Sequence, residues 1–134
     1  MGHETRKIMN LNINGADVTD PDNYFGKYVK EVNPDIICMQ EHKKKRGDDV
    51  SAWAAEMEDF LEKMTGEPWA VHTAAHAYKA QSGVAFMHKK RHSFDVFKHV
   101  RADGATECGA EQDPQGRYII AHGADTLDDF CNVY

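Results

Sequence analysis

Three side chains with oxygen ligands follow two segments of the chain whose patterns are typical of β-strands. Glu41 comes directly after residues 36–40, an apolar run expected of a strand buried inside a sheet. Asn12 and Asn14 close an earlier segment, residues 7–13, which alternates as a strand does. Functional groups in α/β folds gather at the carboxyl ends of strands. One carboxylate and two amide oxygens at neighbouring strand ends therefore predict a site for Mg²⁺ (or Mn²⁺), which prefers hard oxygen ligands.

These positions also have structural interpretations. A glutamate at a strand end is more often a solvated rim residue than a metal ligand. Asn14-Gly15 tolerates the positive φ of a tight turn, which explains the asparagine without any function. From the residues alone, both interpretations stay open.

Periodicity predicts the elements that position these side chains. A helix-start signal at residues 20–23 and apolar residues at helical spacing predict a helix over 24–32, which Asn33-Pro34 ends. A second amphipathic helix carries packing residues from Trp53 to Met64 and ends at Thr65-Gly66. Further strands are predicted at 68–73, 83–87, 94–100, 117–121 and 127–134, with a Gly- and acid-rich loop at 103–115.

The order of these elements predicts an α/β fold, with a mixed β-sheet flanked by two helices in a single domain. The net charge of −6 excludes a polybasic coating role, although a nuclease with local basic patches is still allowed. No apolar stretch approaches the roughly 20 residues that cross a bilayer, so we expect no membrane. Three cysteines without a CxxC pair predict buried thiols in an intracellular protein of the cytoplasm or nucleus.

Five motifs occur in the order of a known protein family. Together they resemble the exonuclease–endonuclease–phosphatase superfamily, in particular exonuclease III, apurinic/apyrimidinic endonucleases and the endonuclease domains of non-LTR retroelements. The runs Leu-Asn-Ile-Asn-Gly and Gly-Arg-Tyr-Ile lean toward the retroelement branch. The motifs lie at residues 7–15, 33–43, 81–86, 113–120 and 130–134.

The resemblance implies roles for individual residues in the Mg²⁺-dependent hydrolysis of DNA phosphodiesters, as in DNA repair. Glu41 matches the metal-binding glutamate, and Asn12 matches the strand-one asparagine of the active site. Asn14 falls near the metal, and Tyr134 matches the tyrosine that faces the scissile phosphate. The nucleic-acid-binding residues implied or predicted beside them are Arg117, Lys43, Lys44 and Ser82.

The chain also departs from the family pattern. Leu11 replaces an aromatic residue, and His42 stands where threonine is common. The chain ends at Tyr134 without the Gly-Asp-x-Asn and Ser-Asp-His segments that supply further catalytic groups. We therefore expect residues 1–134 to be the N-terminal part of a truncated domain, one half of the family's four-layer α/β sandwich. Such a half is expected to have little or no activity and to expose an apolar sheet face, which favours self-association or a missing C-terminal half as partner.

Other features are open to more than one interpretation. The basic clusters at residues 43–46 and 89–91 suit either phosphate contacts or solvated loops. His72 and His76 have the spacing of zinc ligands on a helix, but the segment before them looks extended, which disfavours zinc. The alternatives to a DNA endonuclease are a catalytically dead remnant that serves as an interaction module, or a phosphoesterase of the same superfamily acting on small phosphoesters.

Overall fold

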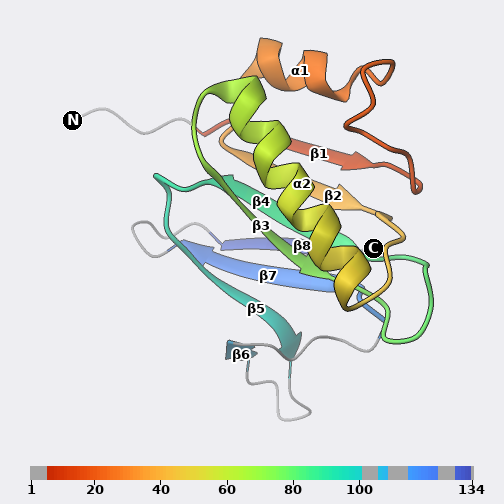
Figure 1. The fold of residues 1–134 in the computed structure, drawn as a ribbon. Helices are drawn as coiled ribbons and strands as arrows, with labels where there is room; N and C mark the ends of the chain where they lie inside the picture. The colour runs from red at the N-terminus through yellow and green to blue at the C-terminus, as the bar shows by residue number, and fades with distance from the viewer. Residues whose placement is uncertain (1–5, 101–105, 109–114, 124–128, 134) are drawn as a thin grey trace.

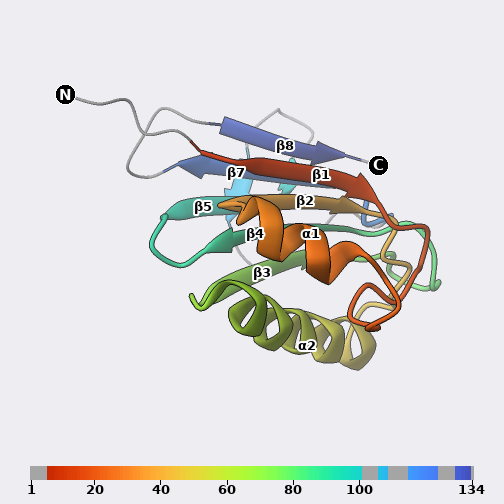
Figure 2. The same ribbon diagram turned by 90° about the horizontal axis from the view of Figure 1, so that it is seen from above.

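The computed structural model describes residues 6–100, 106–108, 115–123 and 129–133, and it forms three layers (Figure 1). Both helices lie on one face of a four-stranded sheet, and a second sheet covers the other face (Figure 2). The elements are β1 (Ile8–Asn12), α1 (Phe25–Val32), β2 (Ile36–Gln40), α2 (Asp48–Thr65), β3 (Trp69–Ala74), β4 (Val84–Lys89), β5 (Phe94–Val100), β6 (Thr106–Cys108), β7 (Tyr118–Gly123) and β8 (Asp129–Val133).

The first sheet is mixed and has the order β1-β2-β4-β3. β1 and β2 are parallel, with Ile8 opposite Ile36 and Asn12 opposite Gln40. Parallel neighbours need a crossover connection, and α1 supplies it. β4 runs antiparallel to both β2 and β3. The carboxyl ends of β1 and β2 therefore meet at one edge of the sheet, beside the start of β4.

β2 is buried on both faces, as its apolar run predicts. Ile37 and Met39 pack under the helices, whereas Ile36 and Cys38 pack against the second sheet. Burial raises the pKa of the Cys38 thiol to about 11, so this cysteine stays a protonated core residue at neutral pH. The prediction that Cys38 is a buried thiol is confirmed.

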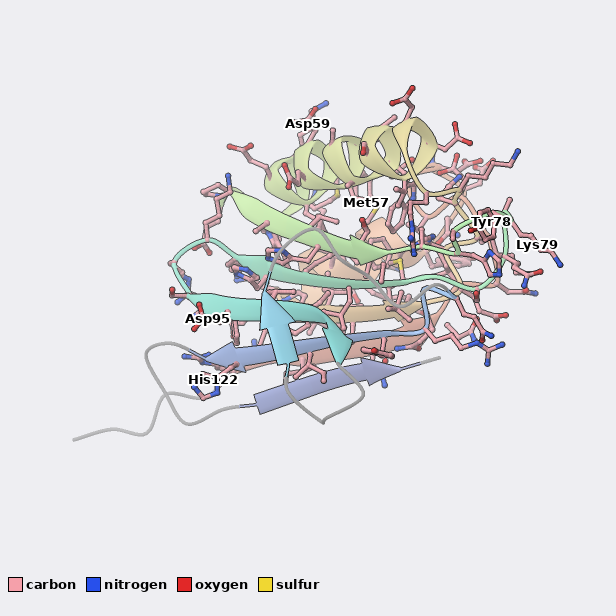
Figure 3. The ribbon with its side chains drawn as sticks, turned by 90° about the horizontal axis from the view of Figure 1, so that it is seen from below. Met57, Asp59, Tyr78, Lys79, Asp95 and His122 are labelled. Atoms are coloured by element: carbon pink, nitrogen blue, oxygen red, sulfur yellow. The ribbon has the colours of Figure 1, made fainter. Side chains whose placement is uncertain are left out.

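α2 buries one face on the first sheet. Its residues Trp53, Met57 and Leu61 follow one another at four-residue spacing and are all buried. Figure 3 shows Met57 directed toward the sheet and Asp59 directed away from it. The helix ends at Gly66, whose φ of 76° is left-handed and whose N–H bonds to the carbonyl of Glu62. The predicted packing role of this helix is confirmed.

The α/β fold class is confirmed, but the strands after β4 form a second antiparallel sheet, β6-β5-β7-β8, instead of extending the first. β6 lies inside the segment predicted as a loop. The second sheet covers the face of the first that we expected to be bare: Ile36 and Phe86 are both fully buried. That expectation is wrong for these strands, although Ile8 on the edge strand β1 remains 49% exposed.

No helix in the described part of the chain is both long enough and apolar enough to cross a bilayer.

Candidate active site at the carboxyl ends of β1 and β2

The two strands that carry the predicted ligands end side by side. The N–H of Ile13 donates to the carbonyl of Gln40 (3.0 Å), which extends the parallel pairing one residue beyond β1. Directly after this bond the chain turns away at Asn14 on one side and at Glu41 on the other. Figure 2 shows the tips of β1 and β2 at the same end of the molecule as the tip of β8. The backbones of Asn12, Asn14 and Glu41 are thus brought together, as the sequence predicts.

The backbone of Glu41 is held from two directions. Its N–H donates to the carbonyl of Gly83 (2.8 Å), and its carbonyl accepts the N–H of Gly15 (2.8 Å). Its φ is 59°, in the left-handed region that residues other than glycine seldom adopt. The loops after β1 and before β4 therefore fix the direction in which the Glu41 side chain leaves the backbone.

Left-handed residues that are not glycine concentrate at this edge. In the described part of the chain they number five, and one of them, Asn33, caps the end of α1. The other four are Asn14, Glu41, Lys43 and Ser82, with φ between 47° and 59°. Asparagine tolerates this conformation in a turn, but for Glu41, Lys43 and Ser82 it costs on the order of 1–3 kcal/mol and persists only where surrounding contacts enforce it. Strain of this kind clusters at functional sites, and all four residues belong to the predicted site.

The two asparagine side chains have different partners. Oδ1 of Asn12 accepts the N–H of Asn14 (3.0 Å), a local turn bond that leaves the oxygen a second lone pair. Oδ1 of Asn14 accepts a hydrogen bond from Nζ of Lys43 (2.7 Å). The aliphatic part of Lys43 lies over Gly15, where a Cβ would come 3.1 Å from Cδ of the lysine. The lysine therefore bridges the ends of the two strands.

His42 holds this edge of the sheet through hydrogen bonds of its ring. Its buried ring donates from Nε2 to the carbonyl of Ala74 (3.0 Å) and accepts the N–H of Lys44 at Nδ1 (2.9 Å). Burial, together with the charge of Lys44, lowers the pKa of His42 to about 4, although the bond to Ala74 acts in the opposite direction. A neutral histidine therefore holds the residues that follow Glu41. The sequence marks His42 only as a departure from the family pattern, which gave no indication of this role.

The four residues of the basic cluster after Glu41 have two different roles. Lys43, Lys44 and Lys45 line a cavity of about 400 Å³ together with Trp53 and two acidic residues of α2. The guanidinium group of Arg46 instead donates twice to the carbonyl of Ala75, at 3.1 and 2.7 Å. Lysine side chains at this cavity suit an anionic ligand, whereas Arg46 ties down the loop after β3.

Two residues of the second basic cluster, Lys89 and Arg91, are structural. Lys89 is buried, with its Nζ 3.2 Å from a carboxylate oxygen of Glu67 and 2.7 Å from Oδ1 of Asn33. Arg91 bonds to Asp35 (2.8 Å) and to Glu67 (2.9 Å). Of the two interpretations open for residues 89–91, the phosphate contact is disfavoured for Lys89 and Arg91, since both are committed to ion pairs.

The segment before β7 joins the same edge. Gly116 packs so closely on the backbone of Ala75 that a Cβ would come 2.3 Å from the Ala75 carbonyl carbon. Ser82 is buried and its Oγ donates to the carbonyl of Gln115 (3.0 Å), while Arg117 is exposed. Tyr118 pairs with Val133 at the end of β8. Tyr134, the predicted phosphate contact, lies outside the described residues.

The loop between β3 and β4 reaches beyond this edge. Figure 3 shows its residues Tyr78 and Lys79 at one end of the molecule, with Asp95 and His122 at the other. Tyr78 is 88% exposed. Sequence patterns did not single out this tyrosine, because one aromatic residue between polar ones carries no periodicity. Its exposure beside the candidate site is visible only in the fold.

The part of the chain that the structure describes contains no group of three or more His, Cys, Asp and Glu side chains arranged to hold a metal ion. The predicted ligand set is of another kind, since it combines one carboxylate with two amides.

Comparison with known proteins shows which solved structures have a similar fold. No protein-family model and no curated protein sequence matches the chain. Among solved structures, the chain is similar to the AP endonuclease LMAP from Leishmania major, with a TM-score of 0.68 at 17% identity over 96% of this chain and 40% of that one. It is also similar to the 3′ phosphatase NExo (D146N) from Neisseria bound to a product DNA hairpin, with a TM-score of 0.59 at 25% identity, covering 97% and 41%. The 3′-5′ exonuclease NExo from Neisseria meningitidis gives a TM-score of 0.57 at 26% identity, covering 96% and 41%.

These similarities confirm the resemblance to the exonuclease–endonuclease–phosphatase superfamily. The chain spans about two fifths of the length of each structure that it matches.

Proposed function

We propose that this chain forms the metal- and phosphate-binding edge of a Mg²⁺-dependent phosphoesterase that acts on DNA. The observation that supports the proposal is the left-handed backbone shared by Asn14, Glu41, Lys43 and Ser82 at one edge of the first sheet. The tight turn at Asn14-Gly15 accounts for Asn14, but Glu41, Lys43 and Ser82 are residue types that seldom adopt this backbone, and the hydrogen bonds that hold Glu41 are those that orient the predicted ligand.

Glu41 and Asn12 fit a divalent cation with hard-oxygen preference. They come from adjacent parallel strand ends, and Oδ1 of Asn12 retains a lone pair after accepting the N–H of Asn14. When bound, Mg²⁺ would neutralise charge that develops on the phosphate during hydrolysis. Glu41 supplies the carboxylate that holds the ion, and the bonds to Gly15 and Gly83 keep its backbone in place without rearrangement on binding.

Asn14 suits the phosphate better than the metal. Its Oδ1 already accepts from the ammonium group of Lys43, and that positive charge opposes a second cation at the same oxygen. We therefore assign Asn14 to orient Lys43, and Lys43 to bind a phosphate oxygen. Lys44 extends the basic surface along the same loop.

The remaining assignments stay predictions. Arg117 is exposed at this edge, where it would contact the nucleic-acid backbone. The hydroxyl of Ser82 is engaged with Gln115, so a contact of this residue with DNA would come from its backbone. Tyr134 follows β8 and would face the phosphate.

The proposed substrate is DNA because the similar structures are an AP endonuclease, a 3′ phosphatase bound to a DNA hairpin and a 3′-5′ exonuclease. Two classes of bond are therefore candidates. One is the phosphodiester at an abasic site, and the other is a phosphoester at a DNA 3′ end, which the similarity to NExo at 25–26% identity favours.

Metal binding tests the proposal on the chain as it is. We expect Mn²⁺ binding, followed by the electron paramagnetic resonance of the free ion, to weaken at least tenfold in Glu41→Gln. The matched control Glu62→Gln changes an exposed glutamate of α2 and should bind Mn²⁺ as the wild type does. Equal binding by all three proteins would exclude Glu41 as a ligand.

Substrate class is tested by incubating the chain with an abasic duplex, a duplex ending in a 3′-phosphate and an intact plasmid. Weak cleavage that needs Mg²⁺ and Glu41 is expected on one of the first two. Mn²⁺ binding without turnover on any of them would favour a metal-binding remnant, which is the alternative of an interaction module.

A further inference from the structure

Two histidine rings meet away from the candidate active site, on the face of the first sheet that the second sheet covers. His72 lies on β3 opposite Phe86, and His88 lies two residues further along β4, opposite Ala70. Residues two apart on one strand share a face, so the two histidines are diagonal neighbours. Their Nε2 atoms are 3.1 Å apart and their rings are inclined by only 15°.

The hydrogen bonds of His88 define its protonation. Its Nδ1 lies 2.9 Å from the carbonyl oxygen of Lys89. A carbonyl only accepts, so Nδ1 carries the proton, and in the neutral ring Nε2 presents a lone pair. That lone pair faces His72. A backbone carbonyl that fixes one ring nitrogen while the other is aimed outward is the usual support of a metal-binding histidine.

The surroundings hold His88 in place and favour its neutral form. The ring of His88 packs against Phe94 and Phe86, with centroids 4.9 and 6.0 Å away. Burial, followed by the nearby charges of His92 and Lys90, lowers the pKa of His88, although its bond to Lys89 acts in the opposite direction. His88 is buried, whereas His72 is only half-buried and lies on β3, the edge strand of its sheet, so solvent reaches the pair from the side of His72.

We propose that His72 and His88 form a bidentate site for a borderline divalent transition-metal ion such as Zn²⁺ or Co²⁺. Two imidazole nitrogens bound to one ion at about 2.0–2.1 Å lie roughly 3 Å apart, close to the separation observed here. The ion replaces the proton that Nε2 of His72 shares with His88. That proton moves to Nδ1 of His72, so the neutral rings lose none overall.

This site is distinct in chemistry from the one proposed at Glu41. Imidazole nitrogen favours Zn²⁺, Co²⁺, Ni²⁺ and Cu²⁺, whereas Mg²⁺ prefers oxygen. Two protein ligands leave the remaining coordination positions for water. The proposal does not rest on the proposed function, and either can fail without the other.

The experiment titrates Zn²⁺ into the chain by calorimetry and records the visible absorption of the Co²⁺ complex. We expect one Zn²⁺ site that is weakened at least tenfold in His72→Gln and in His88→Gln. The control His76→Gln changes a histidine of the next loop and should retain it.

His88→Gln alters a buried position, so the thermal melting of each metal-free variant is measured first. His72→Gln, at the half-buried position, keeps the test valid if His88→Gln unfolds. Loss of the Co²⁺ absorption in His72→Gln, with the fold intact, supports the site. Saturable Zn²⁺ binding that is unchanged in His72→Gln, or no saturable binding in the wild type, overturns it.

Discussion

Nζ of Lys43 donates a 2.7 Å hydrogen bond to Oδ1 of Asn14, and this bond joins the ends of two parallel strands. Both residues have left-handed backbones. The bond holds a positive charge at Asn14, two residues beyond the proposed metal ligand Asn12. A site with a carboxylate on one side and an ammonium group on the other suits a metal-bound phosphate better than a bare cation.

The lysines at this edge should contribute to DNA binding through charge alone. The logarithm of the DNA-binding constant falls with the logarithm of the salt concentration, and each phosphate contact that is removed makes this dependence less steep by about 0.9. For binding to a duplex, we expect Lys43→Ala/Lys44→Ala to reduce the magnitude of this slope by about 1–2. Fluorescence anisotropy across a series of salt concentrations measures it. The control is Lys27→Ala/Lys30→Ala on α1. An equal change in both double variants would mean that DNA does not bind preferentially at the edge that carries Lys43 and Lys44.

Glu41→Gly should separate stability from metal binding. Glycine adopts a φ of 59° without the steric cost that glutamate bears there. We expect the variant to be as stable as the wild type or more stable by up to about 1 kcal/mol in urea denaturation, and to lose Mn²⁺ binding. Glu62→Gly in α2 should cost about 0.5–1 kcal/mol. A large destabilisation by Glu41→Gly would show that the side chain of Glu41 is structural.

Gly83 is required by the ring of His42. A Cβ at Gly83 would lie 2.2 Å from Cε1 of His42, and the φ of Gly83 is 87°. Gly83→Ala should therefore destabilise the fold by about 2–4 kcal/mol, because steric overlap adds to backbone strain. Gly66→Ala has a φ of 76° with nothing within 4 Å, so it should cost only about 1 kcal/mol. Equal losses in urea denaturation would argue against the close contact.

His42 should make the fold sensitive to mild acid. Its pKa is about 4 in the folded chain against 6.5 in the unfolded chain, so the unfolded state binds more protons between these values. The free energy of unfolding should fall as the pH is lowered from 6.5 to 4, by up to about 3 kcal/mol from this residue. The lowered pKa of His88 acts in the same direction. Denaturation curves of wild type and His42→Gln across this range isolate the share of His42, and parallel curves would contradict it.

The carboxyl of Asp35 is expected to affect the free energy of unfolding at a lower pH than His42 does. Burial alone would raise its pKa, but the N–H of Lys7, the ring of His92 and the charges of Lys89 and Arg91 outweigh burial and lower it. Its contribution to stability is therefore lost only below its ordinary value of 3.8. The effect of His42 can be measured above that pH without interference from Asp35.

Local sequence patterns were sufficient to predict several helices and strands of this protein and the edge that carries the candidate site. The apolar run 36–39 and the spacing of Trp53, Met57 and Leu61 fix a strand and a helix, because each needs only its own period and a buried face. The order of strand and helix makes β1 and β2 parallel neighbours, and that places Asn12 and Glu41 at one edge. These conclusions require no knowledge of distant contacts.

Only the tertiary structure decided how that edge is held. The left-handed φ of Glu41 depends on the loop at Gly83, and the role of His42 depends on the carbonyl of Ala74, more than 30 residues away. The division of the later strands into a second sheet, and the meeting of His72 with His88 across β3 and β4, also depend on register. A sequence records the period of each strand, whereas the partner and register of a strand are set by packing across the whole fold.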